Sequence, residues 1–487
     1  MKKSIATIIA LAAIVAIGVQ SAGATGTKEA APGAPTAPAT VRLVLKDLDT
    51  DPNAAQFIDL IEKGMAEAGV NVDIEIVKIP AGNYAEKLSL MIMSGDVPDL
   101  IYFQGGDDKL AAQGILEDLR PYVNKSRYFK SLMDAHSVQR LESYPYLAWI
   151  APPRVRTPVI RRDWYDSLPS AKAVTANPSV DTYYALFKDL VAQKGTKYGI
   201  SVTGATNGVE ELDAIFDACF GITSTWMKGS DGQWVYSRVT PSEKTKLEFY
   251  AKLYKEGLLD PEYLTKKWDS KEQVFYEGKA GIIPGVAPGS IDVYVNKMIK
   301  AQGTDLVALP PAKGKAQGLT PFVDVTKEAR GFAIASTSKV KAAAFAVLDF
   351  IWSPAGLKIA KLGMPGLHYV DDGKQYVLTD KYSEWYNGWF GDSFNGFKAD
   401  KPLSRPIVTP AATAAGDLAK KYMMPDKTIL IPEQYITNWD AMTNLYKEYC
   451  ADIVTGKQPI SAFDEFVAKW NKAGGTDVTK YANTILK

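Results

Sequence analysis

Residues 41–80 read VRLVLKDLDTDPNAAQFIDLIEKGMAEAGVNVDIEIVKIP, and they carry the pattern that decides the fold. The stretch opens with a short run rich in Val and Leu. It closes with a run that alternates apolar and charged residues up to Pro80, and both runs are typical of strands. Between them, apolar residues recur at helical spacing until Gly69. The predicted helix face consists of Phe57, Leu60, Ile61, Gly64 and Met65.

The following segments continue this alternation. NYAEKLSLMIMSG (83–95) has a helical pattern, and DLIYFQGG (99–106) is a short apolar run typical of a buried strand. The resulting order, βαβαβ, predicts an α/β fold with a mostly parallel sheet flanked by helices. Because ligands of such sheets bind at the carboxyl ends of the strands, Asp47, Gln104 and Asp107 are candidate polar contacts.

A second region of similar character begins near Pro153. It combines strand patterns (157–162 and 198–202) with helical patterns (183–195 and 241–257), separated by turn residues. We expect it to form a second α/β lobe. The sequence contains no internal repeat and no coiled-coil heptad.

The N-terminal segment has the pattern of a secretory signal peptide. Lys2 and Lys3 precede fifteen apolar or small residues, and Ala22-Gly23-Ala24 forms a small-residue cleavage site. Cleavage after Ala24 is expected, and an uncleaved membrane anchor is the alternative. No cysteine lies in or just after the apolar run, so no lipid attachment is predicted. Residues 25–40, rich in Ala and Pro, are expected to form a flexible leader.

Composition narrows the class of partner. The chain is 46% hydrophobic and 23% charged, and removal of Lys2 and Lys3 leaves 54 basic against 55 acidic residues. Such a near-neutral protein is not expected to bind nucleic acid or acidic membranes. Cys219 and Cys450 could pair in an oxidising compartment, but two distant cysteines form neither a disulfide framework nor a metal motif.

Several kinds of catalytic centre lack the necessary residues. His136 and His368 are the only histidines. Two are too few for a multi-histidine metal site, and they leave little choice of a base for a Ser-His-Asp centre. The sequence contains no P-loop and no dinucleotide-binding fingerprint. Carboxylates are abundant, so a pair of catalytic carboxylates of the glycosidase type stays an alternative. His368 is either hydrogen-bonded within a loop or a ligand contact.

Two local clusters could contact a ligand. EWYNGWFGDSFNGF (384–397) holds six aromatic residues interrupted by glycines, which suits either a stacking platform or a loop packed on its own domain. PPRVRTPVIRRDW (152–164) holds four arginines, which suit either carboxylate capture or ordinary salt bridges. The arginines are Arg154, Arg156, Arg161 and Arg162.

Taken together, several segments resemble the extracellular solute-binding proteins of ABC importers. The resemblance is to the carbohydrate-type group that includes maltose-binding and long oligosaccharide-binding proteins, and it runs from about Val41 to the C-terminus. Its clearest parts are SGDVPDLIYFQGG (94–106), a Tyr-Pro pair before the second lobe (143–168), LYKEGLLDPEYL (253–264), FYEGKAGIIPG (275–285), LVALPPAKGKAQGLTPF (306–322), RGFAIASTSKVKAAAFAVLDFIWSPAG (330–356), MPGLHY (364–369) and DIVTGKQPISAFDEFVAKWNKAGG (452–475).

The resemblance implies a type II periplasmic-binding-protein fold, in which two lobes close on a ligand at the hinge. The expected division assigns 41–148 with 325–355 to lobe 1, and 149–324 with 356–487 to lobe 2. Because sugar rings stack on aromatic faces, Trp385 and Trp389 become the main stacking candidates. Trp149 and Trp226 are second candidates, and Arg330 is expected to face the cleft.

Two departures from the family pattern affect the expected site. IPGVAPGS follows GKAGI where maltose-type proteins carry a stacking Trp, and KDLVAQKGTKYGISV replaces a calcium loop found in long members. No metal is therefore expected at this loop, and no cofactor is predicted. The missing lipid-attachment cysteine points to a soluble periplasmic protein.

The leading hypothesis is a periplasmic binding protein for an oligosaccharide, an acidic one if the arginine cluster faces the cleft. It would deliver this ligand to ABC permease subunits, without catalysis and as a monomer. The alternatives are a secreted glycoside hydrolase, and a sensor that presents its closed form to a membrane receptor kinase.

Overall fold

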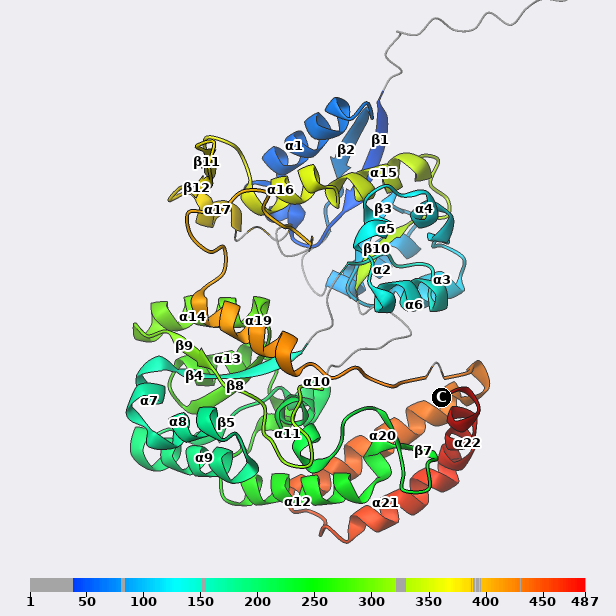
Figure 1. The fold of residues 1–487 in the computed structure, drawn as a ribbon. Helices are drawn as coiled ribbons and strands as arrows, with labels where there is room; N and C mark the ends of the chain where they lie inside the picture. The colour runs from blue at the N-terminus through cyan, green and yellow to red at the C-terminus, as the bar shows by residue number, and fades with distance from the viewer. Residues whose placement is uncertain are drawn as a thin grey trace, which may run out of the picture. The chain divides into compact units, whose positions relative to one another are not determined.

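The first of two main sheets joins four strands in the order β10-β3-β1-β2 in the computed structural model (Figure 1). β1 pairs in parallel with β2 and β3, and only β10 runs antiparallel to its neighbour β3. The predicted βαβαβ unit and its mostly parallel sheet are confirmed. The strands are β1 (Ala39–Val44), β2 (Val72–Ile76), β3 (Leu100–Phe103) and β10 (Gly331–Ile334).

The structure describes residues 38–79, 84–150, 155–320, 330–386, 388, 390, 394, 396–429 and 431–486. Internal contacts divide the chain into Met1–Pro38 and Ala39–Lys487, and all elements lie in the second unit. The predicted signal peptide and most of the predicted leader fall outside the described residues. The leader ends before β1, which begins at Ala39, two residues earlier than expected.

Helix α1 (Ala54–Glu67) follows the predicted pattern closely. Phe57, Ile61 and Met65 are buried, and Leu60 is half-buried. α1 packs against α15 and α16 beside the first sheet (Figure 1). The remaining elements of this region are η1 (Leu48–Thr50), α2 (Tyr84–Met93), α3 (Asp107–Ala112), α4 (Arg120–Lys125), α5 (Phe129–Leu132), α6 (Ala135–Ser143), α15 (Lys341–Ile351), α16 (Pro354–Leu362), β11 (Tyr369–Asp371), β12 (Tyr376–Leu378) and α17 (Tyr382–Tyr386).

The segment after α15 belongs to the core of the first sheet. Leu357, Ala360, Trp385, Phe390 and Phe394 share one hydrophobic cluster with residues of β1, α1 and β3. This packing differs from the expected division, which assigned everything from 356 onward to lobe 2. The difference arises because the apolar face of α16 packs against α1, a contact between segments about 300 residues apart that no local pattern reveals.

The second sheet has the order β5-β8-β4-β9 and mixed strand directions. β4 runs antiparallel to both β8 and β9, whereas β5 and β8 are parallel. The prediction of a mostly parallel sheet is therefore wrong for this lobe. The partners of β4 lie more than a hundred residues later, where local alternation does not determine strand direction. The strands are β4 (Arg156–Arg161), β5 (Tyr198–Ile200), β8 (Ala280–Val286) and β9 (Leu306–Ala308).

Helices surround the second sheet and extend it into a large C-terminal layer. α12 packs against α20, which in turn packs against α21 (Figure 1). Thr240 caps α12 by accepting a hydrogen bond from Glu243 N, and Pro241 is its first residue. The elements are α7 (Arg162–Ser167), α8 (Pro169–Ala176), α9 (Val180–Lys194), α10 (Gly204–Asn207), α11 (Glu210–Phe220), β6 (Trp226–Lys228), β7 (Trp234–Tyr236), η2 (Ser237–Val239), α12 (Pro241–Lys255), η3 (Tyr263–Thr265), α13 (Trp268–Tyr276), α14 (Gly289–Gln302), α19 (Pro410–Tyr422), α20 (Glu433–Thr455), α21 (Ala462–Trp470), η4 (Asn471–Gly475) and α22 (Thr476–Ile485).

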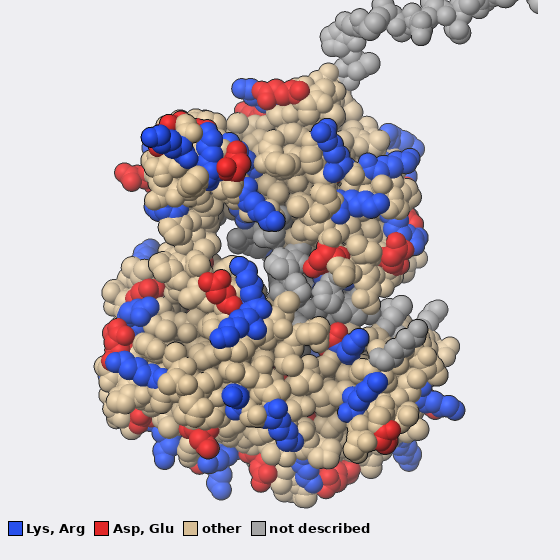
Figure 2. Space-filling model, in the orientation of Figure 1, with Lys and Arg blue, Asp and Glu red and all other residues tan. Residues whose placement is uncertain are grey.

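The surface has no strongly basic face in the view of Figure 2, where blue and red side chains alternate. This distribution agrees with the near-neutral composition. Among the described residues, no single helix has both the length and the apolar character needed to cross a bilayer; α15 and α16 meet these criteria only as a pair bent by 66°.

Candidate functional site

A cavity of about 820 Å³ lies in the second region, and we call it the tyrosine pocket. Its walls come from α10, α11, η2, η3, α20 and the segments around 223 and 426. Its polar, charged and aromatic lining residues include Glu210, Asp213, Asp217, Ser224, Thr225, Tyr236, Arg238, Tyr263, Thr320, Asp426, Tyr446 and Lys447.

Local sequence explains how the pocket wall forms. β5 ends at Ile200, and the loop after it leads into α10 and then α11, so that α11 begins near the carboxyl end of a strand. Gly204 allows α10 to approach η3, because a Cβ at this position would lie 2.4 Å from the carbonyl oxygen of Tyr263. The first turn of α11 carries Glu210, Glu211 and Asp213, and carboxylates are favoured at this end of a helix.

A buried ionic network connects α11, η2 and α12 in this part of the pocket wall. The Lys246 Nζ lies 2.7 Å from Asp213 Oδ1, 2.8 Å from Asp217 Oδ1 and 3.0 Å from Glu243 Oε2. The Arg238 guanidinium contacts the same three carboxylates at 3.0–3.3 Å. Burial raises the pKa of Asp217 to about 6 although Arg238 opposes this shift. Burial also acts against ionisation of Asp213, but Arg238 and Lys246 outweigh it and lower the pKa.

Glu210 differs from these carboxylates. Among the described residues, none forms a hydrogen bond or ion pair with its side chain, which is half-buried. Burial raises the pKa of Glu210 to about 7, although the more distant charge of Arg156 acts in the opposite direction. A desolvated carboxyl group in a cavity, with a pKa close to neutrality, is a typical feature of functional sites.

Replacing Glu210 with Gln is expected to stabilise the protein above pH 7. A raised pKa means that the folded state binds more protons than the unfolded state between pH 4.5, the ordinary pKa, and about 7. The free energy of unfolding therefore falls as pH rises through this window, by at most about 3 kcal/mol. The free energy of unfolding of Glu210→Gln, measured by urea denaturation at several pH values, should not fall over this window. Glu248→Gln, which removes an exposed carboxylate on α12, should retain the fall.

Two hydroxyl groups of the pocket have no hydrogen-bond partner among the described residues. The Tyr263 hydroxyl and the Thr320 Oγ1 are buried, and neither forms a hydrogen bond with a described residue. Tyr263 itself is fully buried. Since buried polar groups are normally paired, these oxygens indicate a place where a ligand can supply the missing hydrogen bonds.

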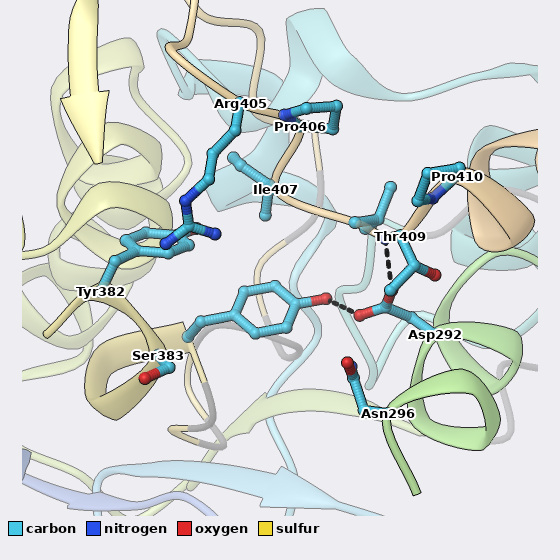
Figure 3. Close-up of a pocket in the computed structure, with 11 residues that line it drawn as sticks. Asp292, Asn296, Tyr382, Ser383, Arg405, Pro406, Ile407, Thr409 and Pro410 are labelled. Atoms are coloured by element: carbon cyan, nitrogen blue, oxygen red, sulfur yellow. Dashed lines mark hydrogen bonds between the residues drawn. The ribbon is translucent and has the colours of Figure 1, made fainter. Parts of the chain in front are cut away.

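A second cavity, of about 500 Å³, lies between α14, α17 and the segment 405–410 (Figure 3). Its main carboxylate is already satisfied: Asp292 accepts hydrogen bonds from the Tyr386 hydroxyl at 2.5 Å and from Thr409 N at 2.6 Å. Arg405 lies over the Tyr382 ring and donates to Thr379 O. Because these groups bind one another, the tyrosine pocket is the better candidate for ligand binding.

The predicted polar residues of lobe 1 lie near the ends of β1 and β3. Asp47 is exposed, adopts φ 61° and contacts Lys46 at 2.6 Å, and Gln104 is half-buried. Because β1 and β3 are parallel neighbours, these two side chains lie at the same sheet edge, as predicted. Asp107 is fully buried and accepts a hydrogen bond from Tyr144. Arg330 is half-buried just before β10. Their roles in ligand binding remain predictions.

The aromatic candidates are mostly core residues. Trp385 is fully buried, donates from Nε1 to Ile359 O and Ala360 O, and packs on Phe57 and Phe390. A ring without an exposed face cannot stack on a sugar, so a packing role replaces the predicted one. Trp389 lies outside the described residues. His368 is buried against Trp385 and accepts a hydrogen bond from Met364 N, which matches the loop alternative.

Trp149 and Trp226 are also buried, so the stacking role considered for them does not fit their packing. Trp149 packs on Tyr102 and Phe332 in the core of the first sheet. Trp226 packs behind Tyr236, a residue that lines the tyrosine pocket. Of the two, only Trp226 lies next to the proposed binding cavity.

The arginine cluster has acidic partners within the protein. Arg156 lies 3.7 Å from Glu211, Arg161 2.7 Å from Asp163, and Arg162 4.0 Å from Asp305, whereas Arg154 is outside the described residues. These contacts correspond to the salt-bridge alternative rather than to carboxylate capture.

The two cysteines are separate buried thiols. Within the part of the chain that the structure describes, no three His, Cys, Asp or Glu side chains are grouped so that they could hold a metal ion. The expected absence of a metal and a cofactor remains a prediction.

Sequence reasoning did not identify the pocket residues Glu210, Arg238, Tyr263 and Asp426. One local indication was available: EELD, residues 210–213, places three carboxylates just after a strand and a glycine-containing loop. The other residues come from positions up to about 200 residues apart, and only folding brings them together.

Comparison with known proteins identifies the family. The profile of the bacterial extracellular solute-binding proteins matches residues 49–358. The polygalacturonan/rhamnogalacturonan-binding protein YtcQ of Bacillus subtilis is 20% identical over 86% of each chain. The fructooligosaccharide ABC transporter substrate-binding protein FusA of Streptococcus pneumoniae is 24% identical over 48% of this chain and 46% of its own.

Solved structures show the same fold. The N-glycan transport solute-binding protein NgtS of Streptococcus pneumoniae superimposes with a TM-score of 0.65 at 14% identity, over 92% of this chain and 97% of its own. The alginate-binding protein AlgQ2 superimposes with a TM-score of 0.64 at 19% identity, over 92% of this chain and 98% of its own. The predicted two-lobed type II fold is thereby confirmed, and the chain belongs to the bacterial extracellular solute-binding proteins.

Proposed function

We propose that this solute-binding protein captures an oligosaccharide in the tyrosine pocket and delivers it to the permease of an ABC importer. The observation that carries the proposal is a pocket of about 820 Å³ that combines the half-buried rings of Tyr236 and Tyr446 with the hydroxyl groups of Tyr263 and Thr320, which have no partner among the described residues. Tyrosine rings provide apolar faces for sugar C–H groups, and fixed polar groups bind sugar hydroxyls. Relatives named for binding fructooligosaccharides, polygalacturonan and N-glycans support this ligand class.

The proposal includes export to the periplasm and binding without catalysis. The predicted signal peptide supports export, and membership of an extracellular family agrees with it. The carboxylates Asp213 and Asp217 are held by buried cations in the pocket wall, which leaves them poorly placed for acid/base work on a substrate.

The test is calorimetric titration and thermal unfolding of residues 25–487 against neutral, amino and uronic-acid oligosaccharides, amino acids and short peptides. A ligand at a hundred times its dissociation constant stabilises the folded state by about 2.7 kcal/mol, which gives a measurable rise in melting temperature. A rise with a saccharide, with that saccharide recovered unchanged, is expected. A rise only with peptides would remove the carbohydrate assignment, and shortened saccharide products would indicate a hydrolase.

Replacing Tyr263 with Phe is expected to weaken saccharide binding without destabilising the protein. The hydroxyl has no partner among the described residues, so its removal costs no internal hydrogen bond. Loss of one ligand hydrogen bond of about 1–2 kcal/mol corresponds to a loss in affinity of about 5- to 30-fold. Titration calorimetry measures the affinity, and urea denaturation measures the stability.

Tyr183→Phe is the matched control. The Tyr183 hydroxyl is also fully buried but donates to Pro310 O at 2.6 Å. Its removal should lower the free energy of unfolding and leave affinity unchanged. If Tyr263→Phe behaves like this control, the Tyr263 hydroxyl is a structural group and does not contact the ligand.

A further inference from the structure

The tyrosine pocket has an excess of negative charge. Its charged lining residues are Glu210, Asp213, Asp217, Asp426, Arg238 and Lys447, four carboxyl groups against two cations. The buried pair behind this wall, Glu243 and Lys246, adds one charge of each sign and leaves the excess unchanged. A ligand that enters this pocket therefore meets a site that favours positive charge.

Three of the four carboxylates already have partners. Asp213 and Asp217 bind Arg238 and Lys246, as described above. Asp426 accepts hydrogen bonds from Ser224 Oγ at 2.8 Å, Thr225 N at 2.7 Å and Thr225 Oγ1 at 2.9 Å. Glu210 is the remaining member, and no described residue is paired with it.

The charges around Glu210 come from four elements. Arg156 on β4, Arg238 in η2 and Lys447 on α20 are the cations, and Asp213 on α11 is the anion. Arg156 lies 3.7 Å from Glu211, and Arg238 is shared among three carboxylates. Lys447 is exposed to solvent, where its field is screened. None of the three cations forms an ion pair with Glu210.

We propose that Glu210 pairs with a protonated amino group of the ligand, so that the bound oligosaccharide contains at least one sugar with a free amine. This inference rests on the proposed function. An ammonium group carries three N–H donors and a positive charge. It offsets the cost of a desolvated carboxylate more fully than a sugar hydroxyl does.

The buried hydroxyl oxygens of Tyr263 and Thr320 provide the second line of support. Both line the same cavity as Glu210, both lack partners among the described residues, and both can accept an N–H or a sugar hydroxyl. A metal ion is a poorer occupant, because the described residues contain no group of three metal-ligating side chains. A uronate would place a further negative charge in an already acidic pocket.

The test compares four tetrasaccharides by titration calorimetry at pH 7.0: β-1,4-linked glucosamine, its fully N-acetylated form, maltotetraose and tetragalacturonate. The amino form should bind at least tenfold more tightly than its acetylated form and than the uronate. Glu210→Gln should remove most of this advantage, so that the amino and acetylated forms bind this variant with similar affinities. Glu248→Gln, which removes the same charge from an exposed site on α12, should retain it.

The pH dependence provides an independent readout. Affinity for the amino form should rise from pH 5.5 toward neutrality as Glu210, whose pKa is about 7, ionises, and fall at higher pH as the sugar amine loses its proton. Glu210→Gln should lack the acidic limb of this profile.

The outcomes distinguish the inference from the function on which it rests. If the acetylated, neutral or uronic-acid form binds as tightly as the amino form or more tightly, the amine is not recognised and the inference is wrong, while the proposed function stands. If no saccharide binds, the proposed function is wrong as well.

Discussion

Replacing Lys246 with Met is expected to lower the free energy of unfolding by about 3–5 kcal/mol, because it leaves buried charge unpaired. Lys246 is fully buried and contacts three carboxylates within 3.0 Å. In its absence, Arg238 must balance Asp213, Asp217 and Glu243. Urea denaturation at pH 7.5 measures the loss.

The same variant should be less damaged in acid. The pKa of Asp217 is about 6 in the intact protein, and removal of a neighbouring cation raises it further, so this group takes up a proton readily as pH falls. The difference in unfolding free energy between wild type and Lys246→Met should therefore be smaller at pH 5.5 than at pH 7.5.

Lys244→Met is the matched control. Lys244 lies two residues earlier on α12 and binds Asp464, whose side chain is 70% exposed. Exposed ion pairs contribute less than about 1 kcal/mol, so this variant should be nearly as stable as wild type. Similar losses in the two variants would mean that the buried network is not a major source of stability.

Replacing Trp385 with Ala is expected to lower the free energy of unfolding by about 3–5 kcal/mol. The ring fills the space between Phe57, Phe390 and His368, and its Nε1 donates to the carbonyl oxygens of Ile359 and Ala360. The substitution therefore removes both buried apolar surface and hydrogen bonds at the end of α16. Denaturant unfolding is the measurement.

Trp385→Phe separates packing from ligand contact. It retains an aromatic ring and should lose less stability than Trp385→Ala. Both variants, if folded at 20 °C, should bind the ligand with wild-type affinity. A selective loss of affinity with normal stability would restore the stacking role that the aromatic composition suggested.

Local patterns predict local structure in this chain. The βαβαβ unit was predicted because the strand alternation and the helical face of α1 are contained within short windows. The antiparallel pairing of β4 with β8 and β9 was not predicted. These strands lie more than a hundred residues from β4, so no short sequence window contains both partners.

The same distinction applies to the site. The aromatic stretch at 384–397 was identified, but composition alone does not indicate whether a ring faces solvent or core, and Trp385 faces the core. Glu210 was not identified because its significance depends on burial and on the absence of a partner, and both are properties of the folded chain. Asp47 and Gln104 were placed together correctly because parallel strands bring their ends to one edge.

The two buried thiols make this protein suitable for conversion into a fluorescent reporter. Cys219 and Cys450 are 5% and 4% exposed, and burial raises the pKa of each thiol to about 12. Since thiolates are the reactive species, neither native cysteine should take up maleimide dyes under mild conditions. A single cysteine introduced at the exposed rim of the pocket could then be labelled alone, without removal of a native residue, and its emission would follow saccharide binding in real time.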